Sequence, residues 1–205
     1  MEDIRQLKQA QVDALREVAN IGAGHAATAL SQLIDRRIMI TVPQVRVARL
    51  EDVAGLVGDP REVVAAVLIH MLGDLTGRTL MLFNERSARR LCDMLLRRPL
   101  GTTTAFSELE QSGLKETGNI LAGAYLNALS DFMGMLLLPS VPSLVVDLSS
   151  AVLTTTYLNF THERDFAFCV ETSFHFDHSE ELHGYFLLLP DLASLKAIFD
   201  AIRLT

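Results

Sequence analysis

Residues 13–31 read DALREVANIGAGHAATALS, and 99 residues later residues 112–130 read SGLKETGNILAGAYLNALS. The two stretches carry the same residue at nine of their nineteen positions, and the same offset also matches Pro142 to Pro43. A constant offset over this length is typical of a repeated structural unit. The sequence therefore predicts an internal duplication.

Apolar residues in both stretches recur with the 3.6-residue period of an amphipathic helix, which predicts long helices over residues 3–34 and 107–133. Shorter segments with strand and helix patterns follow each of them in the same order. In the first half we expect strands at 37–50, 62–72 and 76–83 and a helix at 85–96; in the second, strands at 143–156, 165–176 and 183–189 and a helix at 191–203.

The offset between the halves grows to 107 towards their ends, where Gly184 matches Gly77 and Asp200 matches Asp93. Roughly eight residues are therefore inserted in the second half. We place them before Gly184, in the loop DHSEE of residues 177–181.

These patterns predict an α/β protein of the α+β type. We expect one domain over residues 1–205, made of two repeats at about 1–99 and 100–205. The repeats would share one central mixed or antiparallel sheet in a pseudo-two-fold arrangement, with the two long helices on one side.

Composition excludes several classes of partner. The chain has 205 residues, of which 49% are hydrophobic, and its net charge is −7. An acidic surplus of this kind does not favour nucleic acid or an anionic membrane as partner. The amino-terminal residues lack the basic and apolar regions of a secretory signal, so we expect a cytoplasmic protein. Cys92 and Cys169 lack the spacing of a metal or redox motif and are expected to be core thiols.

A spaced polar pattern recurs in both halves, written [Asp or Ser]-x3-Glu-x2-Asn-x22-Pro. Its members are Asp13, Glu17, Asn20 and Pro43 in the first half, and Ser112, Glu116, Asn119 and Pro142 in the second. At 100° per residue the three polar side chains of each helix share one narrow stripe, opposite the apolar side. Each polar stripe must therefore face solvent or a partner.

A glycine lies one turn beyond each asparagine, on the same stripe, as Gly24 and Gly123. A glycine in a helix costs about 1 kcal/mol relative to alanine. Bare backbone at the same point of both helices suggests close approach by another molecule.

An exposed Glu-x2-Asn pattern is ordinarily a solvated surface. Repetition argues otherwise here, because neighbouring exposed positions differ between the halves, as at Thr28 and Asn127, while the Glu, Asn and Pro are kept. Asparagine is also a poor residue for a helix centre.

At these residues the sequence resembles the CheC/CheX/FliY family of chemotaxis phosphatases, over essentially the whole chain. The two stretches quoted first look like that family's signature helices, and residues 138–148, LPSVPSLVVDL, resemble the segment that follows the second helix. Within the family, two intact motifs with no room for an added domain fit the CheC branch.

The resemblance implies hydrolysis of the aspartyl phosphate of a CheY-type response regulator. It assigns Asn20 and Asn119 to positioning the attacking water, and Glu17 and Glu116 to contact with a lysine of the regulator. An amide suits the first role, because it accepts a hydrogen bond from water without placing negative charge beside the phosphoryl group.

The same resemblance implies supporting residues around each site. They are Asp13 and Ser112 for partner contact, and Pro43 and Pro142 for shaping the strand beneath each helix. The chain would need no cofactor or metal of its own, since the Mg²⁺ is expected on the regulator.

A second class of function stays open, in which the chain binds without turnover. It would sequester the phosphorylated regulator or bind the receptor deamidase CheD. The resemblance implies the CheD contact near the segment that follows the second helix, where Asp147 is the candidate.

Two other groups of residues have plainer interpretations. A histidine- and carboxylate-rich hairpin could be read as a metal site, but alternating strand positions that run into a solvated loop give the same composition without convergence. Its members are His175, Asp177, His178, Glu180, Glu181 and His183. The arginine-rich helix at 85–96 is expected to be a solvated face.

Overall fold

The computed structural model describes residues 9–157, 166–176 and 180–203. Within these ranges the elements follow in this order: α1 (Gln9–Ile34), β1 (Ile38–Ile40), β2 (Gln44–Arg49), α2 (Leu50–Val53), β3 (Val63–Gly73), β4 (Gly77–Asn84), α3 (Glu85–Leu95), α4 (Glu108–Met133), β5 (Leu137–Pro139), β6 (Ser143–Leu148), α5 (Ser149–Tyr157), β7 (Phe166–Phe176), β8 (Glu180–Pro190) and α6 (Leu192–Arg203).

The eight strands form one sheet, in the order β1-β7-β8-β4-β3-β5. Strand β2 also pairs with β7, and β6 also pairs with β3, so β1 and β2 make one edge of the sheet while β5 and β6 make the other. Every strand pair is antiparallel, which settles the choice between a mixed and an antiparallel sheet.

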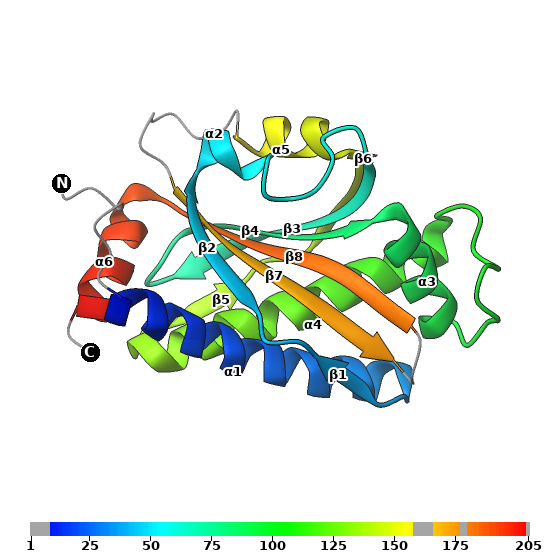
Figure 1. Cartoon of the computed structure of the whole chain (residues 1–205), viewed down its shortest axis with the longest axis horizontal. Helices are drawn as coiled ribbons and strands as arrows, with labels where there is room; N and C mark the ends of the chain where they lie inside the picture. Colours follow the sequence, from blue (N-terminus) through cyan, green and yellow to red (C-terminus); the bar gives the residue numbers. More distant parts are fainter. Residues whose placement is uncertain (1–8, 158–165, 177–179, 204–205) are drawn as a thin grey trace.

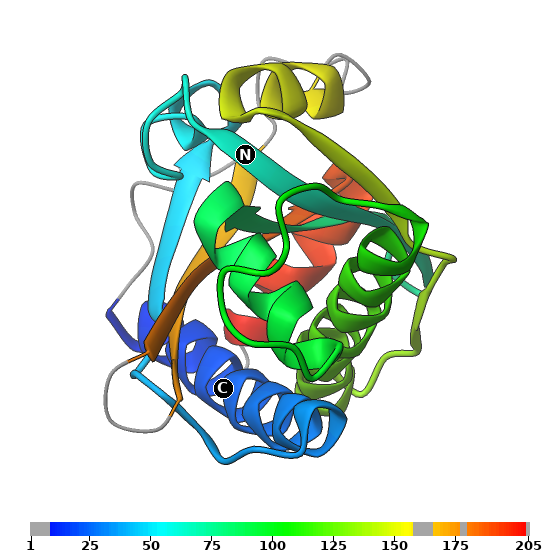
Figure 2. The ribbon, with the colours of Figure 1, turned by 90° about the vertical axis from the view of Figure 1, so that its right-hand side faces the viewer.

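Helices cover both faces of this sheet (Figures 1 and 2). Helices α1, α3, α4 and α6 pack on one face, where alternate residues such as Val67 and Ile69 of β3 enter the larger core. The intervening residues, such as Ala66, face a smaller core under α2 and α5. The period-two alternation of side chains along a strand produces these two cores. The predicted α+β class, with two long helices on one side of the sheet, is confirmed.

The first three elements recur at a constant spacing. α1, β1 and β2 reappear 99 residues later as α4, β5 and β6, each with the same length as its counterpart. In Figure 1, α1 and α4 lie side by side beneath the sheet and run in opposite directions. The sequence offset thus corresponds to an equal spacing of the elements.

Pro43 and Pro142 lie in the breaks between β1 and β2 and between β5 and β6. Ile40 and Gln44 are four positions apart in the sequence, but their partners in β7, Phe174 and Glu171, are only three positions apart. Each edge strand therefore carries one extra residue at its break, and the second edge shows the same shift against β3. A β-bulge of this kind suits a proline, which has no N–H to donate to the ladder.

The expectation of one strand over residues 143–156 is wrong beyond Leu148. Residues 149–157 form α5, and the buried side chains of Ser149, Val152, Leu153 and Thr156 follow the spacing i, i+3, i+4, i+7 of a helix face. The β-branched composition of this segment favoured a strand, but packing on the sheet selected the helix.

The extra residues of the second half do not all lie in the hairpin loop, as the sequence had suggested. Val63 and Phe166, which begin β3 and β7, are 103 residues apart, whereas β2 and β6 are 99 apart. Four of the extra residues therefore lie between β6 and β7. Residues 177–179 of the loop fall outside the described ranges.

Cys92 and Cys169 are free thiols buried in the two cores, as expected. Burial raises the pKa of each to about 12, so both stay protonated and inert at neutral pH. Among the helices of the described ranges, none is both long and apolar enough to cross a bilayer.

Candidate functional site

The polar stripe of each long helix lies on the side away from the sheet. In α1 the side chains of Asp13, Glu17 and Asn20 are exposed, while Leu15 and Val18 between them are buried in the larger core. The amphipathic period sets this orientation, because burying the apolar side turns the polar side outward.

The second stripe has the same orientation, with one difference. Ser112 and Glu116 of α4 are exposed, but Asn119 is half-buried where Asn20 is exposed. The two candidate sites are therefore similar but not identical.

Within the described part of the chain, no hydrogen bond or ion pair engages the side chains of Glu17, Asn20, Glu116 or Asn119. Asp13 differs, because its carboxylate accepts from the Arg16 guanidinium at 3.1 Å. The four motif side chains are thus available for contacts with another molecule.

Gly24 and Gly123 face open space. A Cβ added to either would meet no atom within 4 Å apart from its own helix backbone and chain neighbours, so packing gives no reason for a glycine there. Gly22 and Gly118 are different: an added Cβ would lie 2.7 Å from the ring of Tyr125 and 2.6 Å from the side chain of Val67, respectively. The glycines on the stripes are therefore distinct from Gly22, which lets α1 pack closely on α4, and from Gly118, which lets α4 pack closely on β3.

Contact between α1 and α4 fixes the direction of both stripes. Tyr125 of α4 lies against Gly22 of α1, its ring stacks on Phe186 with centroids 4.5 Å apart, and its hydroxyl lies 3.0 Å from Thr172 Oγ1. Burial raises the pKa of Tyr125 to about 12, so the hydroxyl remains a neutral hydrogen-bonding group. This anchor holds the helices rigidly on the sheet.

Some identities between the halves have structural causes. Ser31 Oγ donates to the carbonyl of Ala27 and accepts from the N–H of Ile38 at 3.1 Å, which ties the end of α1 to β1. Ser130, its counterpart, donates to the carbonyl of Met135 after α4. Pro43 is buried and Pro142 half-buried in the edge breaks, so both act on the backbone path.

Asp147 lies away from both stripes, on β6. Its carboxylate is exposed, accepts from the N–H of Leu148 at 2.7 Å, and lines a hollow of about 240 Å³ between β6 and α5, together with His70 and Arg78. This is the opposite face of the sheet from α1 and α4. The structure therefore does not bring Asp147 together with the Glu and Asn residues.

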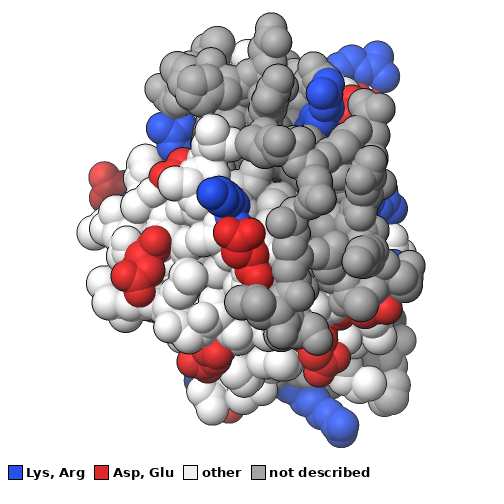
Figure 3. Space-filling view, turned by 90° about the vertical axis from the view of Figure 1, so that its left-hand side faces the viewer, with Lys and Arg blue, Asp and Glu red and all other residues white. Residues whose placement is uncertain are grey.

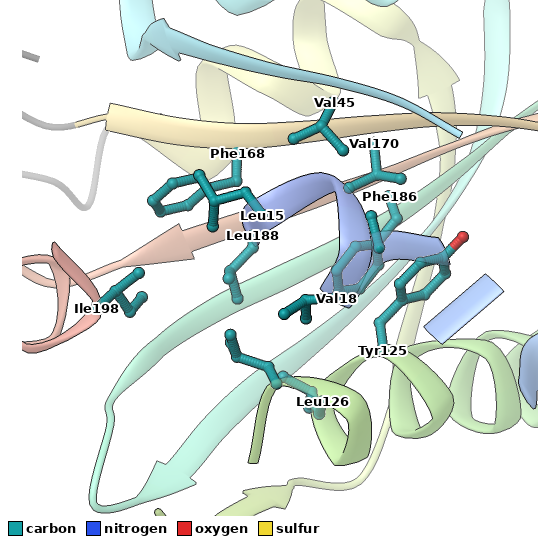
Figure 4. A pocket seen from close by; sticks show the side chains of 12 residues that line it. Leu15, Val18, Val45, Tyr125, Leu126, Phe168, Val170, Phe186, Leu188 and Ile198 are labelled. Carbon is teal, nitrogen blue, oxygen red and sulfur yellow. The ribbon is translucent and has the colours of Figure 1, made fainter. Parts of the chain in front are cut away.

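The cavity beneath α1 is small and apolar. It holds about 50 Å³ and is lined by side chains such as Leu15, Val18, Phe168 and Leu188, which point into it from α1, β7 and β8 (Figure 4). It lies on the reverse side of the stripe and offers no charged group. The polar chemistry of the two helices therefore sits on a convex surface rather than in a cleft.

Charged groups elsewhere are mostly paired. Arg89 pairs with Glu85 at 2.5 Å within α3. Arg98, which follows α3, pairs with Glu110 of α4 at 2.6 Å and so ties this loop to α4. Over the end of the molecule that carries α6 and the start of α1, the described surface shows separate charges and no continuous basic patch (Figure 3).

The hairpin histidines do not gather ligands in the part of the chain that is described. Glu181 lies 3.7 Å from His175 and 3.4 Å from His183, and His183 Nδ1 lies 2.8 Å from Ser173 Oγ. No group of three metal-ligating side chains converges among the described residues. Asp177 and His178 lie outside the described residues.

Two surface features escaped the sequence interpretation. Ile21, beside Asn20, is 42% exposed, and the signal for it was its identity with Ile120. The second is an apolar strip along the β5–β6 edge, formed by Leu136, Leu138, Val141, Val145, Val146 and Leu148.

Comparison with known proteins places the fold and the family. A model of the CheC-like family matches residues 11–47. Over 199 residues the chain is 35% identical to the CheY-P phosphatase CheC of Bacillus subtilis, covering 96% of this chain and 95% of that protein. It is 24% identical over 129 residues to the flagellar motor switch phosphatase FliY of the same species, covering 62% of this chain and 33% of that protein.

A solved structure shows the same fold. FliY of Thermotoga maritima matches with a TM-score of 0.79 at 21% identity, covering 97% of this chain and 98% of that one. Three findings indicate the same family. They are the fold, the two helices with a Glu-Asn motif, and the identity to the Bacillus subtilis protein along nearly the whole length. The chain belongs to the CheC-like family.

Proposed function

We propose that the chain is a CheY-P phosphatase, which hydrolyses the aspartyl phosphate of a CheY-type response regulator at two sites. The observation that carries the proposal is the pair of exposed Glu-Asn motifs on α1 and α4, whose side chains have no partner within the described chain. The name of the Bacillus subtilis relative supports the same activity.

Each site supplies geometry rather than a nucleophile. Asn20, or Asn119 in the second site, accepts a hydrogen bond from a water in line with the acyl phosphate. The water oxygen bonds to phosphorus as the acyl P–O bond breaks, which releases inorganic phosphate and restores the regulator's aspartate. Positioning of this kind contributes much of the barrier reduction in phosphoryl transfer.

Glu17 and Glu116 dock the regulator by pairing with a lysine beside its phosphorylation site. Each lies one turn before its asparagine, so one contact with the helix can engage both side chains. The Mg²⁺ that neutralises the phosphoryl group belongs to the regulator in this scheme.

The test is loss of turnover in a variant that keeps its fold. Asn20→Ala combined with Asn119→Ala is expected to abolish accelerated phosphate release from the acetyl-phosphate-loaded regulator, while binding of the regulator is partly retained. Gln32→Ala with Asp131→Ala is the matched control, since these residues are exposed on the same two helices 99 residues apart. Full activity in the asparagine variant would overturn the proposal.

Turnover also separates an enzyme from a sequestering module. With the chain present at one-tenth of the regulator concentration, an enzyme releases phosphate from the whole pool at an increased rate. A binding module without turnover can affect only the fraction of the regulator that it binds, which is at most equal to its own concentration per site.

A second function is favoured by the exposed apolar edge. β6 pairs with β3 on one side, and no described strand pairs with its other side. We propose this edge, with Asp147 on it, as the contact for a regulatory partner such as the deamidase CheD.

A further inference from the structure

One apolar residue lies within each Glu-Asn motif, exposed in α1 and half-buried in α4. Glu17, Asn20, Ile21 and Gly24 are spaced i, i+3, i+4 and i+7, so they form one continuous patch on α1. The same four residue types recur on α4, where the apolar member is Ile120.

Packing within the chain does not account for an apolar residue at position 21. The Ile21 side chain is 42% exposed and lies outside both hydrophobic cores. On the helical projection it lies between Glu17 and His25, both exposed, and not at the border with the buried side. A polar residue would serve as well in a free solvated helix.

Exposed positions next to the patch have changed between the two halves, whereas the isoleucine has not. Exposed residues around the patch differ between the halves, as at Thr28 and Asn127 or Gln32 and Asp131, whereas Ile21 and Ile120 are the same. The apolar side chain has therefore been kept beside the polar pair in both copies.

We infer that Ile21 and Ile120 are docking residues, which bury their side chains against an apolar group of the response regulator beside its phosphorylated aspartate. This inference rests on the proposed function. Gly24 supports it, because the open space over that glycine lets the regulator approach the helix backbone one turn further on.

The docking role predicts a specific kinetic signature. In a single-site background made by Asn119→Ala, the change Ile21→Ser raises the KM for the phosphorylated regulator about tenfold, which corresponds to about 1.4 kcal/mol of lost binding. It leaves kcat within a factor of two, because the water and its asparagine are untouched. Ile21→Leu keeps a large apolar side chain, so its KM is expected to stay close to that of the parent.

Gln32→Ser in the same background is the matched control, since it removes an exposed side chain of α1 outside the patch. Thermal melting of each variant checks the fold, and an exposed isoleucine predicts an almost unchanged melting temperature. A KM within a factor of two of the parent, or a fall in kcat alone, would overturn the docking role.

Binding without turnover separates this inference from the proposed function. When the regulator is held in its phosphorylated form by beryllofluoride, Ile21→Ser is expected to weaken binding by the same factor as KM. If the parent binds this form but releases no phosphate, the enzymatic proposal fails while the docking result stands. If the parent is active and the Ile21→Ser variant binds as the parent does, only the docking inference fails.

Discussion

Two glycines of α1, separated by a single residue, have different reasons to be there. Gly22 makes room for the Tyr125 ring, whereas Gly24 has open space where a side chain would be. Replacing Gly24 and Gly123 by alanine should raise stability by up to about 1 kcal/mol per site, because alanine loses less backbone entropy in a helix. We expect the melting temperature to rise by about 2–4 °C per kcal/mol and phosphatase activity to fall, since each methyl group intrudes on the approach of the regulator.

Gly22→Ala is the control for this pair. Its methyl group would lie 2.7 Å from the Tyr125 ring, so circular dichroism should show a lower melting temperature. A Gly24→Ala, Gly123→Ala variant that melts higher and keeps full activity would remove the argument for close approach at these positions.

Thr117, a buried threonine of α4, has a feature that the sequence alone does not predict. Thr117 is fully buried with an unpaired Oγ1, while the equivalent position of α1 carries Val18. The apolar counterpart indicates that the core needs the shape rather than the hydroxyl. Periodicity places both residues on the buried side, but cannot say whether a hydroxyl finds a partner there.

The two sheet edges differ in chemistry although they occupy equivalent places. Strand β2 exposes Arg46 and Arg49, and charged side chains of this kind protect an edge from pairing with another chain. Strand β6 instead exposes Val145, Val146 and Leu148. An edge that is apolar in one repeat and charged in the other is suited to recognise a partner on one side only.

The change Val145→Arg gives β6 the residue that β2 has 99 positions earlier. It should weaken binding of a CheD-type deamidase at least tenfold by titration calorimetry, and leave phosphatase turnover intact because Val145 lines the hollow beside Asp147, on the opposite face of the sheet from α1 and α4. Arg46→Ser at the other edge is the matched control and should bind as the parent does. Equal affinities in the two variants would contradict a docking role for the β6 edge.

At the level of elements, the sequence was most informative where one signal dominated. The long period predicted α1 and α4, and the tight turn at Gly73-Asp74 predicted the pair β3 and β4. The bounds of α4, β3 and β4 match to within one residue, whereas the predicted start of α1 lies outside the described residues. The segment after β6 misled, because its threonines and valine favour a strand while Val152, Leu153 and Thr156 carry a helical spacing. Such a conflict is resolved by the surface that the segment packs against, which only the tertiary structure shows.

For the whole molecule, the constant offset predicted two equivalent surfaces but not how they are directed. That depends on the contact between the helices. Gly22 lies nine residues after Asp13, half a turn around α1, and meets Tyr125, which lies nine residues after Glu116 on α4. Each polar stripe therefore points away from the other helix.

Opposed stripes predict that one chain can hold two regulators at once. We expect a titration with the beryllofluoride-bound regulator to saturate at two regulators per chain, and at one after Glu17→Arg, because an arginine would repel the regulator's lysine at that site. The phosphatase rates of the single variants Asn20→Ala and Asn119→Ala should then add up to the parent rate, with unequal shares, since Asn20 is exposed and Asn119 half-buried. Saturation of the parent at one regulator per chain would contradict two independent docking surfaces.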